Sequence, residues 1–396
     1  MSNVTNFSIS RIPTLDIGQG SMKKITKWIL LNNSKKVLLI TGNKSIENES
    51  KLDQITQLIK KANAIFERII CEKEPSIFFT DEIIKKYYIK NFDSVIAIGG
   101  GSVIDLGKVL SALLPKGNSV MDHIEVVGKG IPYHGLKLPY LVLPTTSGTG
   151  GEATKNAVLG KFEKKTGFKF SIRNEKLIPD SVIIDGNLLT SLPKKITISC
   201  GFDTLTQLVE SFLSRSSNEF SDAIVWNGLK LFIPNFINAC DKDSSNPVVR
   251  ELIGYASFCS GVGLTNADLG IVHGIANHLG SRFSIPHGIV CSILFSASQK
   301  INLKAIKQRD PNNYSLKKMA MIGTLFPSSN NLREEDYIKV FIDKIDEWTN
   351  TLKVPFLSEY GVKDEDINDL ILCSSNRKNP IKLYEDEIRN LLKLRL

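Results

Sequence analysis

The 396-residue chain lacks the features that mark membrane and secreted proteins. No apolar run reaches the roughly 18 residues that a membrane-spanning helix requires. Residues 1–20 lack the basic-then-apolar layout of a signal peptide. A cytoplasmic location without a membrane partner is therefore expected.

Cysteine and histidine are both scarce. The six cysteines are scattered singly without a CxxC pair, which argues against a disulfide framework and against a cysteine zinc site. Of only five histidines, His273, His278 and His287 lie within residues 271–290. A single histidine is usually a satisfied core or surface residue. This clustering instead favours a metal site, because neutral imidazole is the commonest nitrogen ligand of zinc and divalent iron.

Concentrated basic charge is also absent. The net charge is +9, but the lysines and arginines are spread along the chain in doublets. A nucleic-acid-binding protein would concentrate this charge and interleave aromatic residues, so no nucleic-acid partner is expected. The charge indicates a lysine-rich solvated surface or, alternatively, a mild preference for anionic ligands.

The length of the chain is typical of two sizeable domains. In the first half, apolar runs that end in glycine alternate with helical patterns, whereas the second half is helical throughout. The fold class predicted for residues 1–188 is an α/β domain with a mostly parallel, Rossmann-like sheet and helices on both faces. Residues 189–396 are predicted to form an all-helical domain.

Two glycine-rich loops follow strands of the predicted sheet. The first is IAIGGGSVIDLGK (96–108) and the second is PTTSGTGGEAT (144–154). Glycine lets the backbone approach a ligand closely, and a helix N-terminus offers free N–H groups to an anion. Neither loop reads GxGxxG, and GGGS after a strand is compatible with a simple tight turn. Together the two loops favour a nucleotide site at the carboxyl ends of the strands.

The segment GFDTLTQLVES (201–211) places Asp203 four residues before Gln207. These positions share one face of a helix. A carboxylate there is a hard ligand that complements the clustered histidines in a metal site.

Seven segments in the same order resemble the iron-containing, or group III, alcohol dehydrogenase family. They cover nearly the whole chain: GGGSVIDLGK (99–108), PTTSGTGGEAT (144–154), PDSVIIDGNLLTSLP (179–193), GFDTLTQLVES (201–211), HGIANHLG (273–280), IPHGI (285–289) and NPIKLYEDEI (379–388). The resemblance implies an N-terminal nucleotide domain, a C-terminal helical domain, and a cleft between them for cofactor, metal and substrate.

The resemblance also implies the cofactor-binding residues. Gly100, Gly101 and Ser102 would surround the pyrophosphate, and Asp105 would orient their loop. From the second loop and beyond it, the implied cofactor contacts are Thr145, Thr146, Thr149 and Lys169, the last of which is otherwise an ordinary surface lysine.

The end of the strand at 35–42 bears on the choice of nicotinamide cofactor. Gly42 occupies a position where NAD-preferring members often carry an aspartate, which would repel a ribose 2′-phosphate. With Asn43 and Lys44 beside it, the sequence favours NADP over NAD, unless Lys44 is only an exposed turn residue.

For the metal centre, the resemblance implies that Asp203, His273 and His287 are ligands, with Gln207 in the place of a fourth, histidine ligand. Two interpretations of Gln207 are open. Its amide oxygen coordinates Fe²⁺ or Zn²⁺ more weakly than imidazole would, or no catalytic metal is bound and the amide contacts the substrate.

A second departure from the family concerns the proton path. Asn277 occupies the position of a histidine that is credited with proton relay, and His278 is displaced from it by one residue, about 100° around the helix. His278, a ribose hydroxyl or water is expected to take that role.

The function that follows is an NAD(P)-dependent interconversion of a small primary alcohol and its aldehyde by metal-assisted hydride transfer. Gln207 and the residues after it also resemble members that act on phosphonoacetaldehyde or 2-hydroxyethylphosphonate. The alternatives are a dehydroquinate-synthase-like lyase or cyclase that uses bound NAD, and a catalytically silent nucleotide-binding protein. A homodimer is expected.

Overall fold

The computed structural model describes residues 6–43, 49–161, 168–327 and 331–396. The chain divides by its internal contacts into two compact units. Among the described residues, the α/β unit comprises Ser10–Pro193 and Lys242–Gly261, and the helical unit comprises Lys194–Asp241 and Val262–Leu396 together with residues 6–9. The segment Lys242–Gly261 therefore groups with the α/β unit although it lies far along the chain from the rest of it.

Within the described residues, six parallel strands form the main sheet in the order β1-β8-β5-β4-β2-β3. Their bounds are β1 Thr14–Ile17, β2 Lys36–Gly42, β3 Ile65–Cys71, β4 Ser94–Gly99, β5 Tyr140–Pro144 and β8 Ser181–Ile184. Strands β6 (Asn156–Lys161) and β7 (Phe168–Arg173) pair separately and antiparallel. The predicted parallel α/β fold is confirmed, whereas β1 and the β6-β7 pair were not anticipated from the sequence.

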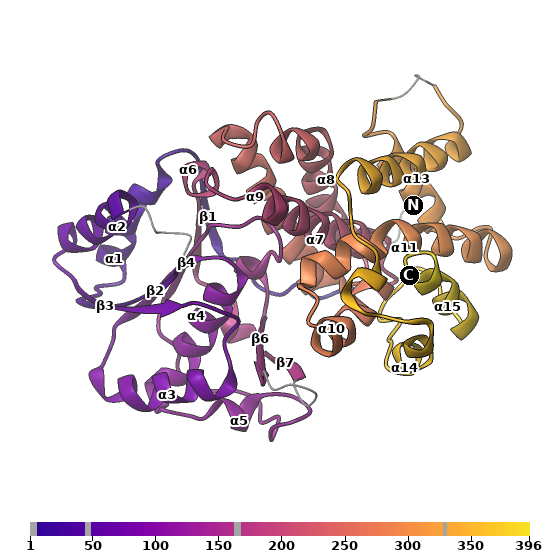
Figure 1. Ribbon diagram of the computed structural model, residues 1–396. Coiled ribbons are helices and arrows are strands. Elements are labelled where there is room, and N and C mark those ends of the chain that lie inside the picture. The colour runs from indigo at the N-terminus through magenta and orange to yellow at the C-terminus, as the bar shows by residue number, and fades with distance from the viewer. Residues whose placement is uncertain (1–5, 44–48, 162–167, 328–330) are drawn as a thin grey trace. The chain divides into compact units, whose positions relative to one another are not determined.

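Continuous apolar runs explain the central strands. In β2, residues 37–40 are all fully buried, as is typical of a parallel strand that is covered on both faces. Helices α1 (Lys24–Leu31) and α2 (Glu49–Lys61) share one apolar core with β2, β4 and β5. Helix α4 (Gly101–Leu113) packs against β4 and β5, and Figure 1 shows it on the opposite side of the sheet from α1 and α2. The remaining helices of this unit are α3 (Ile77–Tyr87), α5 (Val120–His123), α6 (Gly186–Leu189) and most of α9 (Pro247–Ala267).

The helical unit is built around helix α11 (His287–Arg309), which contacts α7, α10, α13 and α15. The other helices are α7 Lys194–Leu213, α8 Glu219–Cys240, α10 Ile271–Phe283, α12 Tyr314–Gly323, α13 Glu334–Thr351, α14 Ile367–Leu372 and α15 Glu385–Lys393. Over the described residues the helical character that was predicted for the second half is confirmed. None of the helices in the described part of the chain has the length and apolarity needed to cross a membrane.

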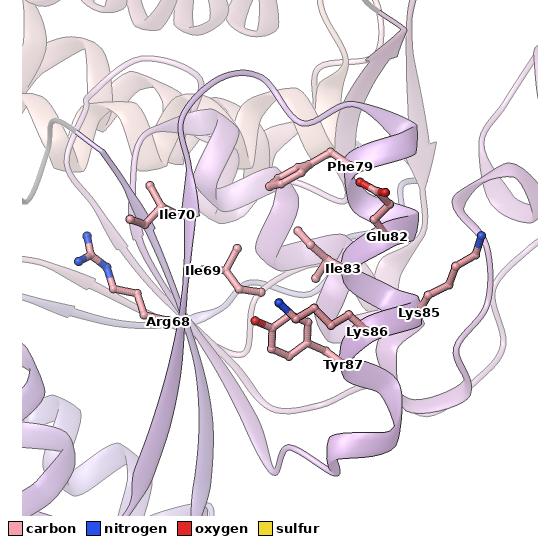
Figure 2. A pocket seen from close by; sticks show the side chains of 9 residues that line it. All are labelled: Arg68, Ile69, Ile70, Phe79, Glu82, Ile83, Lys85, Lys86 and Tyr87. Carbon is pink, nitrogen blue, oxygen red and sulfur yellow. The ribbon is translucent and has the colours of Figure 1, made fainter.

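A hollow of about 660 Å³ lies in the α/β unit between the edge strand β3 and helix α3 (Figure 2). Ile69 points toward Ile83 on the helix, while Arg68 points to the other side of the strand, where its Nε donates a hydrogen bond to Thr41 Oγ1 at 2.9 Å. The lining residues are Arg68, Ile69, Ile70, Phe79, Glu82, Ile83, Lys85, Lys86 and Tyr87. None of them belongs to the glycine-rich loops.

Candidate functional site

Four potential metal ligands converge inside the helical unit. Asp203 from α7, His273 from α10, and His287 and Cys291 from α11 each contribute one ligand atom, and these atoms all lie within 4.8 Å of one another. Asp203, His273 and Cys291 are buried, and His287 is half-buried. The structure thus brings together three of the predicted metal ligands and adds Cys291, which the sequence analysis did not select.

Helix α7 supplies the carboxylate side of this cluster. Asp203, Gln207 and Glu210 lie on one face of α7, as the helical spacing i, i+4, i+7 requires. Asp203 Oδ1 lies 3.4 Å from His273 Nε2 and 3.6 Å from His287 Nε2. The carboxylate oxygen is therefore shared between the two imidazoles.

A glycine at the start of α11 allows this helix to approach α7 closely. A Cβ on Gly288 would lie 2.5 Å from the backbone oxygen of Ser199 on α7, a distance at which one of the two helices would have to move. The close approach places the first turns of α11 beside Asp203. It brings both His287 and Cys291, four residues apart on one face, into the cluster.

Glu210 orients His273 from outside the cluster. Its Oε2 lies 2.7 Å from His273 Nδ1, and its Oε1 accepts a hydrogen bond from the backbone N–H of Val272 at 2.7 Å. A carboxylate on Nδ1 holds the proton there and leaves Nε2 free to bind a metal, as in carboxylate–histidine–metal arrangements. The sequence analysis missed Glu210. Its position seven residues after Asp203, about two helical turns along the same face, was the available signal.

The electrostatics of the cluster favour a cation. Burial disfavours the protonated form of His273, but Cys291, Asp203 and Glu210 together raise its pKa well above the ordinary value. Burial likewise opposes ionisation of Asp203, but His287 and His273 lower its pKa. The anionic groups therefore hold positive charge at this point, and a divalent ion could supply it in place of protons.

Gln207 contacts the cluster through Asp203. Its amide Nε2 donates a hydrogen bond to Asp203 Oδ1 at 3.0 Å, and the side chain is buried. In this orientation the amide nitrogen, which has no lone pair for a metal, faces the ligand oxygen. Coordination by the amide oxygen stays a prediction.

Neither Asn277, at the position of the family's proton-relay histidine, nor the relay candidate His278 belongs to the cluster. Asn277 and His278 follow His273 on α10, and both are exposed. His278 lies five residues after His273, which corresponds to about 500° of helical rotation. Its side chain therefore leaves the helix about 140° away from that of His273. Their catalytic roles stay predictions.

The two glycine-rich loops lie together at the carboxyl ends of β4 and β5 in the α/β unit. A Cβ on Gly100 would lie 3.1 Å from Thr146 Cγ2, and one on Gly101 would lie 3.2 Å from Thr149 Cγ2. The backbone N–H of Thr145 donates to the oxygen of Gly99 at 3.0 Å. Helix α4 begins at this point, and its N-cap residue makes no side-chain capping bond within the described structure. The N–H of Val103 in this turn already donates to the oxygen of Gly100 at 3.0 Å, so the N–H groups of Gly101 and Ser102 are the ones that can face an anion.

Thr145 adds an unmet hydrogen-bonding group to the second loop. Among the described residues, its Oγ1 is one of the few buried side-chain atoms without a hydrogen-bond partner. A buried polar group of this kind needs an explanation, and a ligand is one such explanation. The predicted residues Gly100, Gly101, Thr146 and Thr149 therefore lie around one helix N-terminus, with Thr145 directly beside them.

Asp105 is directed into the protein. Its Oδ2 accepts a hydrogen bond from the backbone N–H of Val158 on β6 at 3.1 Å, and burial raises its pKa to about 6. Its Oδ1 lies 3.8 Å from the fully buried ammonium of Lys108. Lys108 in turn donates to Thr154 Oγ1 and to the oxygen of Asn156, both at 2.7 Å. Asp105 therefore anchors α4 to β6, which agrees with an orienting role for the first loop.

The remaining predicted cofactor residues are dispersed. Gly42 ends β2 and Asn43 follows it exposed to solvent, whereas Lys44 lies outside the described residues. Ser102 lies in the first turn of α4. Lys169 lies on β7 and forms an ion pair of 2.5 Å with Glu74. Its predicted place near the cofactor stays a prediction.

Two family models match the chain in succession. "Iron-containing alcohol dehydrogenase" matches residues 13–186, and "Fe-containing alcohol dehydrogenase family, C-terminal" matches residues 197–396. The chain is 27% identical over 400 residues to alcohol dehydrogenase 4 of Saccharomyces cerevisiae, with 99% of each chain covered. It is 26% identical over 387 residues to an NADPH-dependent butanol dehydrogenase of Clostridium saccharobutylicum, with 94% of each covered. A solved 1,3-propanediol oxidoreductase superimposes with a TM-score of 0.86 at 26% identity, covering 99% of this chain and 100% of that one.

Proposed function

Because the chain belongs to the iron-containing alcohol dehydrogenase family, we propose that it interconverts a small primary alcohol and its aldehyde by hydride transfer to and from a nicotinamide cofactor. The observation that carries this proposal is the convergence of the buried Asp203 and His273 with the half-buried His287, with Glu210 bound to the far nitrogen of His273. A buried carboxylate with two imidazoles, one of them held in a metal-binding tautomer, is a suitable donor set for a divalent ion.

Asp203, His273 and His287 would hold this ion. When bound, it would act as a Lewis acid on the substrate oxygen. Asp203 brings the negative charge that retains a cation in a buried place, and Glu210 keeps the imidazole of His273 in position with its Nε2 toward the cluster. The burial of Asp203 and His273 keeps water away from the donors, which strengthens their electrostatic interactions.

The glycine-rich loops would hold the cofactor. Gly100, Gly101 and Ser102 present the first N–H groups of α4 to the pyrophosphate, and Thr145, Thr146 and Thr149 approach the same helix end. A side chain on Gly100 or Gly101 would occupy the space beside these threonines. The cofactor itself carries the redox chemistry, while the protein binds and orients it.

We assign NADP as the preferred cofactor. The support is Gly42 at the end of β2, which carries no carboxylate to repel a 2′-phosphate, together with the exposed Asn43 that follows it. The clostridial relative named as NADPH-dependent agrees with this assignment.

The proposed substrate class is a small anionic aldehyde such as phosphonoacetaldehyde. It is supported by the resemblance of the sequence around Gln207 and by the net charge of +9. A short neutral alcohol or aldehyde is the broader alternative. For proton exchange with solvent we retain His278, since it is exposed on the helix that carries His273.

The experiment is a nicotinamide absorbance assay of the metal-loaded protein. It uses NADPH and NADH against butanal, propanal and phosphonoacetaldehyde, with Asp203→Asn as the inactive comparison. Oxidation of NADPH in proportion to aldehyde added supports the dehydrogenase. A reaction that consumes a substrate without net change in nicotinamide absorbance would indicate the cyclase-like alternative. Binding of NADPH without turnover of any aldehyde or alcohol would indicate a silent relic.

Homodimer formation and a cytoplasmic location remain predictions from the family resemblance and the sequence. Sedimentation velocity of the purified protein tests the first. For a dimer, the molar mass obtained from sedimentation would be twice the monomer mass of 43.9 kDa.

A further inference from the structure

We propose that Cys291 is the fourth protein ligand of the metal centre and occupies the coordination position that Gln207 leaves unfilled. The inference deepens the proposed function and rests on its metal site, but it concerns a residue that neither the sequence pattern nor the family resemblance selected. Upon binding, the thiol releases its proton to solvent and its sulfur becomes a thiolate ligand.

The position of the sulfur relative to the other donors carries the inference. Cys291 Sγ lies 3.6 Å from Asp203 Oδ1, 3.8 Å from His273 Nε2 and 3.7 Å from His287 Nε2. With the usual zinc bond lengths, a tetrahedral site separates a sulfur from an oxygen or nitrogen ligand by about 3.6 Å. The distances from the sulfur to all three other ligand atoms therefore match the ligand-to-ligand separations of a tetrahedral site.

The distances among the remaining donors agree with the same geometry. Asp203 Oδ1 lies 3.4 Å from His273 Nε2 and 3.6 Å from His287 Nε2. A tetrahedral zinc site would separate an oxygen from a nitrogen ligand by about 3.4 Å. Helices α7 and α10 each contribute one donor atom and α11 contributes two, and the four atoms surround one point.

The local helix geometry explains how Cys291 reaches this point. It lies four residues after His287 on α11 and is fully buried, so the two side chains project from one face of the helix. Gly288 lets this face approach α7 at Ser199. The sulfur is thereby directed at Asp203.

The role of Gln207 changes accordingly. Its amide nitrogen donates to Asp203 Oδ1 at 3.0 Å, the same oxygen that faces Cys291 and both histidines. Gln207 is then a positioning residue that fixes the carboxylate. A histidine at this position would supply a fourth metal ligand from α7, whereas Gln207 hydrogen-bonds the carboxylate of Asp203. Cys291 on α11 supplies the fourth ligand instead.

The replacement has chemical consequences. Asp203 and a Cys291 thiolate with two neutral imidazoles neutralise a divalent ion, whereas an Asp, Gln, His, His set would leave a net charge of +1. A thiolate is a soft ligand, and a mixed sulfur and nitrogen set suits Zn²⁺ and Co²⁺ better than Mg²⁺ or Mn²⁺. The centre should therefore retain zinc rather than iron when both are offered.

The test is cobalt substitution of the metal-free protein followed by absorption spectroscopy. A thiolate ligand gives an intense sulfur-to-cobalt charge-transfer band in the near ultraviolet, which oxygen and nitrogen ligands do not. We expect this band in the wild type and in Gln207→Ala, and its loss in Cys291→Ser. The control Cys240→Ser changes another buried cysteine of the helical unit and should retain the band. Zinc affinity of Cys291→Ser should decrease by about 100-fold or more, since even indirect partners of ligands contribute about 10- to 100-fold.

The outcomes separate this inference from the proposed function. Cobalt bound without the charge-transfer band overturns the role of Cys291 while leaving a metal-dependent dehydrogenase in place. The band with no turnover of any aldehyde supports Cys291 as a ligand and overturns the proposed activity. A band that persists in Cys291→Ser, or a wild type that binds no cobalt, overturns the inference. The wild-type spectrum alone already decides the first outcome, so the inference can be overturned without relying on the folding of a variant.

Discussion

Glu210 Oε2 lies 2.7 Å from Nδ1 of His273, and the second oxygen of the same carboxylate accepts the backbone N–H of Val272 at 2.7 Å. One buried carboxylate therefore receives two hydrogen bonds from the first turn of α10. It fixes both the beginning of the helix and the imidazole that the helix carries into the metal centre.

We predict that Glu210→Gln weakens zinc binding by about 10- to 100-fold. A glutamine has one oxygen and one NH₂ group, so it can accept only one of the two hydrogen bonds and places a donor against the other N–H. His273 then loses its orientation. Zinc affinity is measured by competition with a chromophoric chelator, and Glu219→Gln, an exposed glutamate on α8, is the matched control. Equal affinity in Glu210→Gln and the wild type would contradict the role assigned to Glu210.

We predict that Gly42→Asp shifts cofactor preference from NADPH toward NADH. An aspartate at the end of β2 would repel the 2′-phosphate and bind a free 2′-hydroxyl. One like-charge contact of about 1.4 kcal/mol corresponds to a tenfold loss in kcat/KM for NADPH. The ratio of kcat/KM for the two cofactors gives the result, and Glu219→Gln, an exposed change in the helical unit, serves as the control. An unchanged ratio would mean that Gly42 does not face the ribose.

We predict that Gly150→Ala destabilises the α/β unit by about 2 kcal/mol or more. Gly150 has a φ of +58°, and a Cβ there would lie 2.5 Å from the backbone nitrogen of Gly261 and 2.5 Å from the oxygen of Ser257. The second glycine-rich loop (144–154) and helix α9 would have to move apart. Gly20→Ala is the matched control, since Gly20 also has a positive φ of +77° but has nothing within 4 Å of the added carbon. Gly20→Ala should therefore cost only the backbone strain of about 1 kcal/mol. Urea unfolding of both variants separates the steric contribution from the backbone strain. Equal urea midpoints for Gly150→Ala and Gly20→Ala would refute the steric contribution at Gly150.

The fourth prediction concerns Glu152. Burial of this side chain raises its pKa to about 7. The ammonium of Lys108 opposes this rise, and Glu152 in turn acts on the titratable groups of Tyr140 and Cys259. The folded chain holds this proton more tightly than the unfolded chain, where the ordinary pKa is 4.5. Stability contributed by Glu152 is therefore fully present below the unfolded pKa and is lost as the pH rises through about 7.

The full pKa difference corresponds to about 3 kcal/mol. We predict that Glu152→Gln, which cannot ionise, loses less stability than the wild type between about pH 5 and about pH 8. Urea unfolding at both pH values gives the difference for each protein, and other titrating groups cancel in the comparison. A variant with the same pH dependence as the wild type would show that Glu152 stays ionised when the chain folds.

Local patterns carried most of the fold. The strands at residues 36–42 and 94–99 form because apolar runs are buried on both faces of a parallel sheet, and their signal is contained in consecutive residues. Strand β1, with only four residues, and the short pair β6-β7 have no such run. Strand β1 forms because β8, distant in sequence, offers it hydrogen-bonding partners, whereas β6 and β7 pair with each other.

The candidate site divides in the same way. The sequence alone determined the helical spacing of Asp203 and Gln207, the grouping of His273 and His287, and the two glycine-rich loops after buried strands. These features depend on residues close together in the chain. Only the tertiary structure decided that Cys291 and Glu210 face them, since that requires α7, α10 and α11 to pack at defined distances. A single cysteine carries no local sign of the metal centre, and Glu210 shows only its helical spacing from Asp203. Their chemistry appears only when Gly288 lets two helices meet and the donor atoms converge.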